Sequence, residues 1–193
     1  MEKKLDTDLF KMAPEDGSCC SDAAGIDADA APAEKKILNV ELLVIDLTSC
    51  KRCVPTADQL QRAVNLLAPA AEALGIELKH REIVIQTSQE AKALGFLSSP
   101  TIRLNGRDIA QDICESLCES CGDLTDGDTL LDCREWHYRG KVYSAAPLPL
   151  LIEALMRAML DIDARPFVPE PIAVLPENLQ RYFDRKRPAT RCC

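Results

Sequence analysis

The feature that most constrains this chain is an apolar run that ends at a pair of cysteines. Residues 37–47, ILNVELLVIDL, are almost continuously apolar, which is typical of a strand buried on both faces of a sheet. Cys50 and Cys53 follow at once, and residues 57–74 then repeat their apolar side chains at helical spacing. The sequence therefore predicts a Cys-x-x-Cys pair at the junction between a central strand and a helix.

A cysteine pair in this position favours thiol chemistry. The first thiol lies over the helix N-terminus, where unpaired N–H groups and the helix dipole stabilise an anion, and the thiolate is the reactive form of cysteine. Lys51 and Arg52 add positive charge on the same turn. We expect Cys50 to be the nucleophile and Cys53 the resolving thiol. The alternatives are a zinc site, since zinc ligands use the same spacing, and two thiols that only pack in a core.

The chain continues with alternating strands and helices. The patterns predict strands over 77–85, 99–104 and 107–109, helices over 88–93 and 147–162, a Ser88 cap and a tight turn at Asn105-Gly106. A further hairpin is expected where residues 135–138 turn into 141–143. This order predicts an α/β fold in which helices flank a central sheet.

Composition divides the chain into three parts. Residues 1–35 include a stretch with almost no large apolar side chain, which predicts a flexible arm. Residues 36–162 form the folded domain, with a cysteine-rich insertion over 110–146 before its last helix. Residues 163–193 form a proline-rich, basic tail, in which residues 176–179 begin one short docking helix.

The cysteine pair and the loop Ser98-Ser99-Pro100-Thr101 together resemble the thioredoxin-like superfamily. The stretches VELLVIDLTSCKRC, GFLSSPTIRLNGRDI and CESCGDL are similar to an uncharacterised bacterial thioredoxin-like family that is catalogued only as a domain of unknown function. The resemblance implies a thioredoxin-like central sheet. It also implies a cis peptide bond at Pro100, which would face the dithiol and act with it in catalysis.

The same resemblance implies how a substrate would bind. Ser99 and Thr101 would present the loop to a partner chain or to a thiol adduct. Lys51 and Arg52 are the expected partner-binding residues between the two cysteines. They stand where classical thioredoxin has Gly-Pro, so the redox potential and the choice of partner are not implied.

Four more cysteines, Cys114, Cys118, Cys121 and Cys133, form a second cluster in the insertion. On a helix the first three would share one face, and four thiolates suit zinc or an iron–sulfur cluster. Three other interpretations stay open: disulfides, thiols that exchange with the main dithiol, and inert thiols.

Two pairs of adjacent cysteines, Cys19-Cys20 and Cys192-Cys193, lie near the ends of the chain. Adjacent cysteines form a strained disulfide, so such pairs tend to stay reduced or to bind a soft cation. The second pair resembles the C-terminal cysteines of mercuric reductases, which pass a metal ion to an inner dithiol. A flexible tail of this length can reach Cys50. The alternative is that these accessory thiols are incidental.

The net charge and the lengths of the apolar runs limit the classes of partner that the chain can bind. A net charge of −8 argues against non-specific binding to nucleic acid or anionic membranes. No apolar run has the length of a signal peptide or of a membrane span. We therefore expect a cytoplasmic protein without nucleic-acid or membrane partners.

The expected function is that of a thiol–disulfide oxidoreductase that acts on protein or small-molecule thiols and disulfides and requires no cofactor. The alternative is a protein that binds or transfers soft metal or metalloid ions, such as mercury or arsenic, through paired thiols. A third interpretation is an adaptor stabilised by zinc at the second cysteine cluster.

Overall fold

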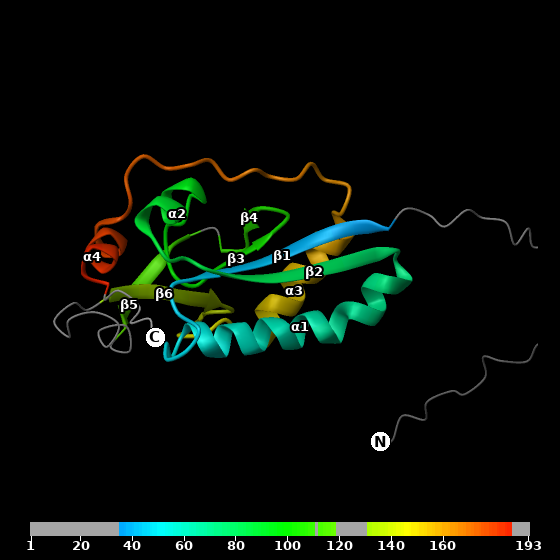
Figure 1. Cartoon of the computed structure of the whole chain (residues 1–193). Coiled ribbons are helices and arrows are strands. Elements are labelled where there is room, and N and C mark those ends of the chain that lie inside the picture. The colour runs from blue at the N-terminus through cyan, green and yellow to red at the C-terminus, as the bar shows by residue number, and fades with distance from the viewer. Residues whose placement is uncertain (1–34, 111, 119–130, 187–193) are drawn as a thin grey trace, which may run out of the picture. The chain divides into compact units, whose positions relative to one another are not determined.

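The computed structural model describes residues 35–110, 112–118 and 131–186, which belong to one compact unit (Figure 1). This part of the chain has a mixed α/β fold with two sheets and four helices. The first sheet contains β1 (Lys36–Val44), β2 (Ile76–Val84), β3 (Thr101–Leu104) and β4 (Arg107–Asp108). The second contains β5 (Cys114–Cys118), β6 (Leu131–Tyr138) and β7 (Lys141–Tyr143). The helices are α1 (Cys53–Ala73), α2 (Ser88–Ala93), α3 (Leu148–Leu160) and α4 (Glu177–Arg185).

The first sheet has the strand order β2-β1-β3-β4, with β1 parallel to β2 and antiparallel to β3. The predicted central strand is confirmed, because β1 has a neighbour on each side and its last three residues, Leu42, Leu43 and Val44, are all buried. Burial of consecutive side chains requires cover on both faces of the strand. The cysteine pair follows this covered end of β1.

Two helices bury the apolar side chains that their helical spacing predicted to face the core. The long helix α1 packs against β2 and α3 (Figure 1). Its Leu60 is fully buried. In α3, Leu151 and Leu155 are buried at the predicted helical spacing. In the described part of the chain, no helix combines the length and the apolar character that crossing a membrane requires.

Two local predictions differ in outcome. The Asn105-Gly106 turn is confirmed: both residues have positive φ, 46° and 83°, as a tight hairpin turn between β3 and β4 requires. The predicted Ser88 cap is wrong, because Thr87 accepts the hydrogen bond from the Glu90 N–H with its side chain and α2 begins one residue later.

The segment after α3 packs onto the rest of the unit as far as Lys186. Phe167 donates its N–H to the Asn105 carbonyl at 3.0 Å. A side chain at Gly106 would collide with the Phe167 carbonyl oxygen, which explains the glycine there. The predicted docking helix is confirmed as α4, which buries Leu179 and Tyr182 in the core.

The insertion forms a sheet of its own. The predicted hairpin is confirmed as β6 and β7, joined by Arg139 and Gly140 with positive φ. The expected helical face at Cys114 and Cys118 is wrong, because these residues begin and end β5, which pairs antiparallel with β6. Pairing with β6 satisfies the backbone of this short segment, which is too short to be a stable helix by itself.

Candidate functional site

The loop between β1 and α1 is built around the carboxylate of Asp46. Its two oxygens accept hydrogen bonds from the backbone N–H groups of Thr48, Ser49 and Cys50, at 3.2, 2.8 and 2.8 Å. Burial acts to raise the pKa of Asp46, but the hydrogen bonds from the Thr48 side chain and from these N–H groups outweigh it and hold the pKa below its ordinary value. The ionised carboxylate therefore fixes the backbone that carries Cys50.

The two cysteines of the pair contact each other and the Ser99 loop. The backbone N–H of Cys53, the first residue of α1, donates to Cys50 Sγ at 3.3 Å. Cys53 Sγ lies 3.4 Å from the Ser99 hydroxyl, and both cysteines are 0% exposed. The hydrogen bond with Cys50 and the burial of the thiol raise the pKa of Cys53. Cys53 therefore keeps its proton while Cys50 accepts a helix N–H, which is compatible with the roles predicted for the two thiols.

The Ser99–Pro100 peptide bond is cis, as the resemblance implied, and it lies next to the dithiol. The Ser99 hydroxyl accepts from the Ile45 N–H at 3.2 Å, which joins the loop to the end of β1. Thr101 is buried and donates from its hydroxyl to the Ser98 carbonyl, so its side chain faces inward. Ser99 therefore contacts a cysteine of the pair directly through its hydroxyl.

The basic residues between the cysteines differ in their surroundings. Lys51 is exposed. Arg52 donates to the Cys133 carbonyl at 2.9 Å, to the Leu117 carbonyl at 2.8 Å and to the Ser116 hydroxyl at 2.8 Å. The guanidinium predicted to bind a partner therefore binds the second sheet of its own chain.

The second sheet brings two further cysteines into the same core. Cys118 is 3% exposed and Cys133 is 0% exposed, whereas Cys114 is partly exposed. The charge of Cys118 contributes to the raised pKa of Cys53. No disulfide links the cysteines within the described residues.

Two of the four cysteines of the predicted metal cluster lie at opposite ends of β5. Four residues along a strand separate Cys114 from Cys118 by about 13 Å, whereas two thiolates on one zinc ion each lie about 2.3 Å from the metal. Within residues 35–110, 112–118 and 131–186, no three His, Cys, Asp or Glu side chains could hold a metal ion together. Cys121 and the vicinal pairs Cys19-Cys20 and Cys192-Cys193 lie outside these residues.

A buried ion pair anchors the second sheet to the first, and no sequence pattern predicts it. Arg134 is 0% exposed and donates from Nη1 to both carboxylate oxygens of Asp108 at 2.8 Å. Its backbone N–H donates to the Ser99 carbonyl at 2.8 Å. The two residues of the ion pair are 26 positions apart and carry no spacing that would have linked them. Asp46 was also missed, although an Asp followed by Thr and Ser is a recognisable turn signal.

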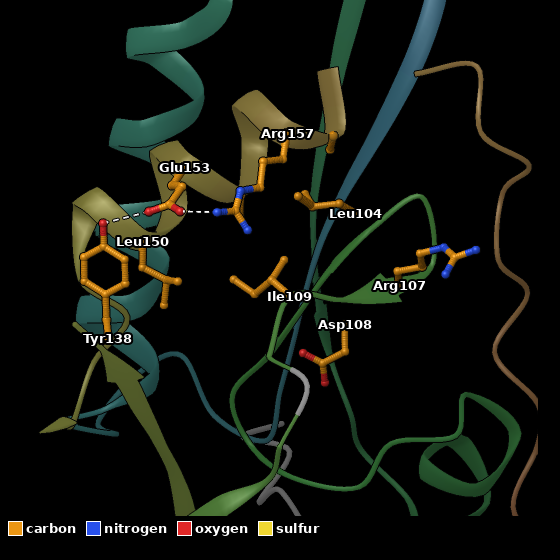
Figure 2. A pocket seen from close by; sticks show the side chains of 10 residues that line it. Leu104, Arg107, Asp108, Ile109, Tyr138, Leu150, Glu153 and Arg157 are labelled. Atoms are coloured by element: carbon orange, nitrogen blue, oxygen red, sulfur yellow. Dashed lines mark hydrogen bonds and ion pairs between the residues drawn. The ribbon is translucent and has the colours of Figure 1, made fainter. Parts of the chain in front are cut away.

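A pocket of about 400 Å³ lies between the β3–β4 hairpin and α3 (Figure 2). Leu104, Ile109 and Leu150 form part of its apolar wall. Glu153 accepts from the Tyr138 hydroxyl at 2.9 Å and from Arg157 at 2.5 Å. Asp108 also lines this pocket, but no cysteine of the described residues does. The pocket is therefore separate from the dithiol, and the Asp108–Arg134 ion pair connects its lining to the second sheet.

Comparison with known proteins gives a family and no activity. No curated protein and no solved structure matches the chain. The family described as "Domain of unknown function (DUF2703)" matches residues 38–155, which include β1 from its third residue, the dithiol, the Ser99 loop and the whole second sheet. The match covers more than half of the chain and agrees with the resemblance seen in its motifs. The chain therefore belongs to the DUF2703 family.

Proposed function

We propose that this protein is a thiol–disulfide oxidoreductase on a thioredoxin-like fold, with Cys50 as the nucleophile and Cys53 as the resolving thiol. The observation that carries the proposal is the hydrogen bond from the Cys53 N–H to Cys50 Sγ at the start of α1. Such a bond stabilises a thiolate at Cys50, and the helix dipole acts in the same direction.

The surroundings of the pair support the thioredoxin-like assignment. In the order β2-β1-β3-β4, β1 is parallel to β2 and β3 is antiparallel to both β1 and β4, and the pair follows the end of the central strand β1. Pro100 follows a cis peptide bond beside the pair, and Ser99 contacts Cys53. These are the elements that the sequence motifs led us to expect together.

The reaction transfers two electrons. The Cys50 thiolate attacks one sulfur of a substrate disulfide, and the substrate's other sulfur leaves as a thiolate that takes up a proton. Cys53 then loses its proton and attacks Cys50 Sγ, which releases the second substrate thiol and leaves a Cys50–Cys53 disulfide. The raised pKa of Cys53 holds it protonated until the mixed disulfide has formed. A small-molecule or protein thiol regenerates the dithiol in the cytoplasm, the compartment we propose.

The test is the reduction of glutathione disulfide by the full chain, with dithiothreitol as the electron source. Cys50→Ser should lose all activity above the uncatalysed rate, because the attacking sulfur is gone. Cys53→Ser should first form a mixed disulfide between Cys50 and glutathione, which residue 53 can no longer resolve, whereas Cys114→Ser, a partly exposed control, should match the unchanged protein. Equal activity of Cys50→Ser and the unchanged protein would contradict the proposal.

The second candidate is the binding of a soft ion such as Hg(II), which needs only two thiolates. The observation that favours it is that the two thiols of the pair are fully buried together in an apolar core. Equilibrium titration separates the two functions. A soft-ion carrier should bind Hg(II) with a stoichiometry that falls by one in Cys50→Ser, and it should show no turnover of glutathione disulfide.

A further inference from the structure

The face of the second sheet that carries Cys118 and Cys133 is a buried face. In the antiparallel register of β5 and β6, Cys118 lies opposite Leu131 and Cys133 lies opposite Ser116. Residues opposite each other, and residues two apart along a strand, point to the same side of a sheet. Both thiols therefore share one face, and their exposed fractions of 3% and 0% place that face in the interior.

Contacts on both strands hold this face against the dithiol. Arg52, between the two cysteines of the pair, donates to the carbonyl of Cys133 on β6 and to the carbonyl of Leu117 on β5. The Arg134 N–H, one residue after Cys133, donates to the carbonyl of Ser99. The Ser99 hydroxyl in turn contacts Cys53 Sγ. Each of the two strands therefore contacts the residues around the dithiol at its own cysteine or at the residue next to it.

All four thiols lie in the buried hydrophobic core of the described residues. Cys50 and Cys53 are as inaccessible to solvent as Cys133. A large partner can reach Cys50 only after β5 and β6 have moved, whereas Cys118 and Cys133 already lie in the same core. Groups held together within one molecule react at effective concentrations far above those of a diffusing partner.

We propose that Cys118 and Cys133 form a second dithiol, which exchanges with the Cys50–Cys53 pair inside the chain. This inference rests on the proposed function and adds to it an internal electron donor, which reduces the Cys50–Cys53 disulfide. The exchange needs no further reagent, because one disulfide and one dithiol only change places.

The exchange proceeds in two steps. The Cys133 thiolate attacks Cys50 Sγ, the Cys50–Cys53 bond breaks, and Cys53 leaves as a thiolate that takes up the proton lost by Cys133. The Cys118 thiolate then attacks Cys133, which forms the Cys118–Cys133 disulfide and returns Cys50 as a thiol. Two electrons and two protons have passed from the second pair to the first.

The mixed disulfide between Cys50 and Cys133 is the species to detect. Diagonal neighbours on adjacent strands lie about 7–8 Å apart, slightly beyond the usual span of a disulfide. Closing the Cys118–Cys133 bond therefore draws β5 and β6 together, so the second step is the slower one.

The experiment uses full-length Cys53→Ser, in which Cys50 cannot be resolved by its neighbour. The reduced variant is treated with glutathione disulfide, remaining thiols are alkylated, and disulfides are mapped by mass spectrometry after cleavage at acidic residues, which separates Cys118 from Cys133. We expect a Cys50–Cys133 disulfide with loss of the bound glutathione. In Cys53→Ser/Cys133→Ser the glutathione should stay on Cys50, and in the control Cys53→Ser/Cys114→Ser the link should persist.

The outcomes separate this inference from the proposed function. Glutathione that remains on Cys50 of Cys53→Ser, without a link to Cys133, overturns the internal exchange and leaves the oxidoreductase proposal standing. Absence of glutathione from Cys50 in both variants, together with absence of a Cys50–Cys133 disulfide in Cys53→Ser, overturns both. Circular dichroism of each variant checks that the substitutions leave the fold intact.

Discussion

The buried thiols and the pocket beside α3 differ in their access to solvent. The thiols of Cys50, Cys53, Cys118 and Cys133 are buried in the core, the last two on strands of the second sheet. Hydrogen bonds to Arg52 and Ser99 hold that sheet in place. The pocket is open and lined by charged side chains such as Glu153 and Arg157 (Figure 2). The reactive groups are therefore in the closed region, and the open region contains none of the described cysteines.

This difference means that access to the dithiol depends on contacts between the two sheets. The Arg134–Asp108 pair connects both regions, since Asp108 lines the pocket and Arg134 belongs to β6 of the second sheet. Substitutions at the contacts between the sheets should change stability and thiol access together. Substitutions confined to the pocket should change neither.

The largest effect is expected from Asp108→Ala. This substitution leaves the guanidinium of the fully buried Arg134 without its carboxylate, which should lower the free energy of unfolding by about 3 kcal/mol. The matched control is Glu153→Ala in the same pocket, where a partly exposed pair contributes less than about 1 kcal/mol. Urea unfolding measures both, and equal losses in the two variants would remove the distinction between the regions.

A smaller effect is expected from Asp46→Ala, which removes the acceptor of three backbone N–H groups. The free energy of unfolding at pH 7 should fall by about 2 kcal/mol. Because folding lowers the pKa of Asp46, its contribution is present above the unfolded-state pKa of about 3.9 and is lost as the pH falls through the lower folded value.

Urea unfolding between pH 7 and pH 3 tests the sign of this dependence. The unchanged protein should lose stability on acidification more steeply than Asp46→Asn, which has no carboxylate to protonate. Parallel curves for the two proteins would show that Asp46 does not fix the loop through its charge.

The smallest change in stability is expected from Arg52→Met, about 1 kcal/mol, because only the hydrogen bonds to the second sheet are lost. The same loss should raise the population of the opened sheet about fivefold. Cys50 should then react about fivefold faster with iodoacetamide, as measured by peptide mass spectrometry. Lys51→Met, on an exposed neighbour, should leave the alkylation rate unchanged. Identical alkylation rates for the two variants would show that Arg52 does not hold the second sheet over the dithiol.

The first sheet was largely predictable because its signals are local. The apolar run of β1, the helical spacing in α1 and the Asn105-Gly106 turn each depend on residues close together in the chain. The cysteine pair at the start of α1 was found in the same way. A local signal also identified α4, whose first turn carries an acid after Pro176.

The second sheet was only partly predictable because long-range contacts form it. The alternation in β5 is masked by cysteines at both of its ends, which can be taken for a helical face as readily as for a strand. The contacts of Arg52 with β5 and β6 and of Arg134 with Asp108 join residues far apart in sequence. No spacing rule predicts such contacts, so the cover over the dithiol became visible only in the structure.

The most direct test of the account is to find where the first disulfide forms. The fully reduced chain is mixed with one equivalent of glutathione disulfide, quenched by alkylation at short times, and mapped by mass spectrometry. We expect a Cys50–Cys53 disulfide as the first product, without glutathione retained on either residue. If both cysteines remain alkylated as free thiols while other cysteines of the chain carry glutathione, the pair at the start of α1 is not the reactive site.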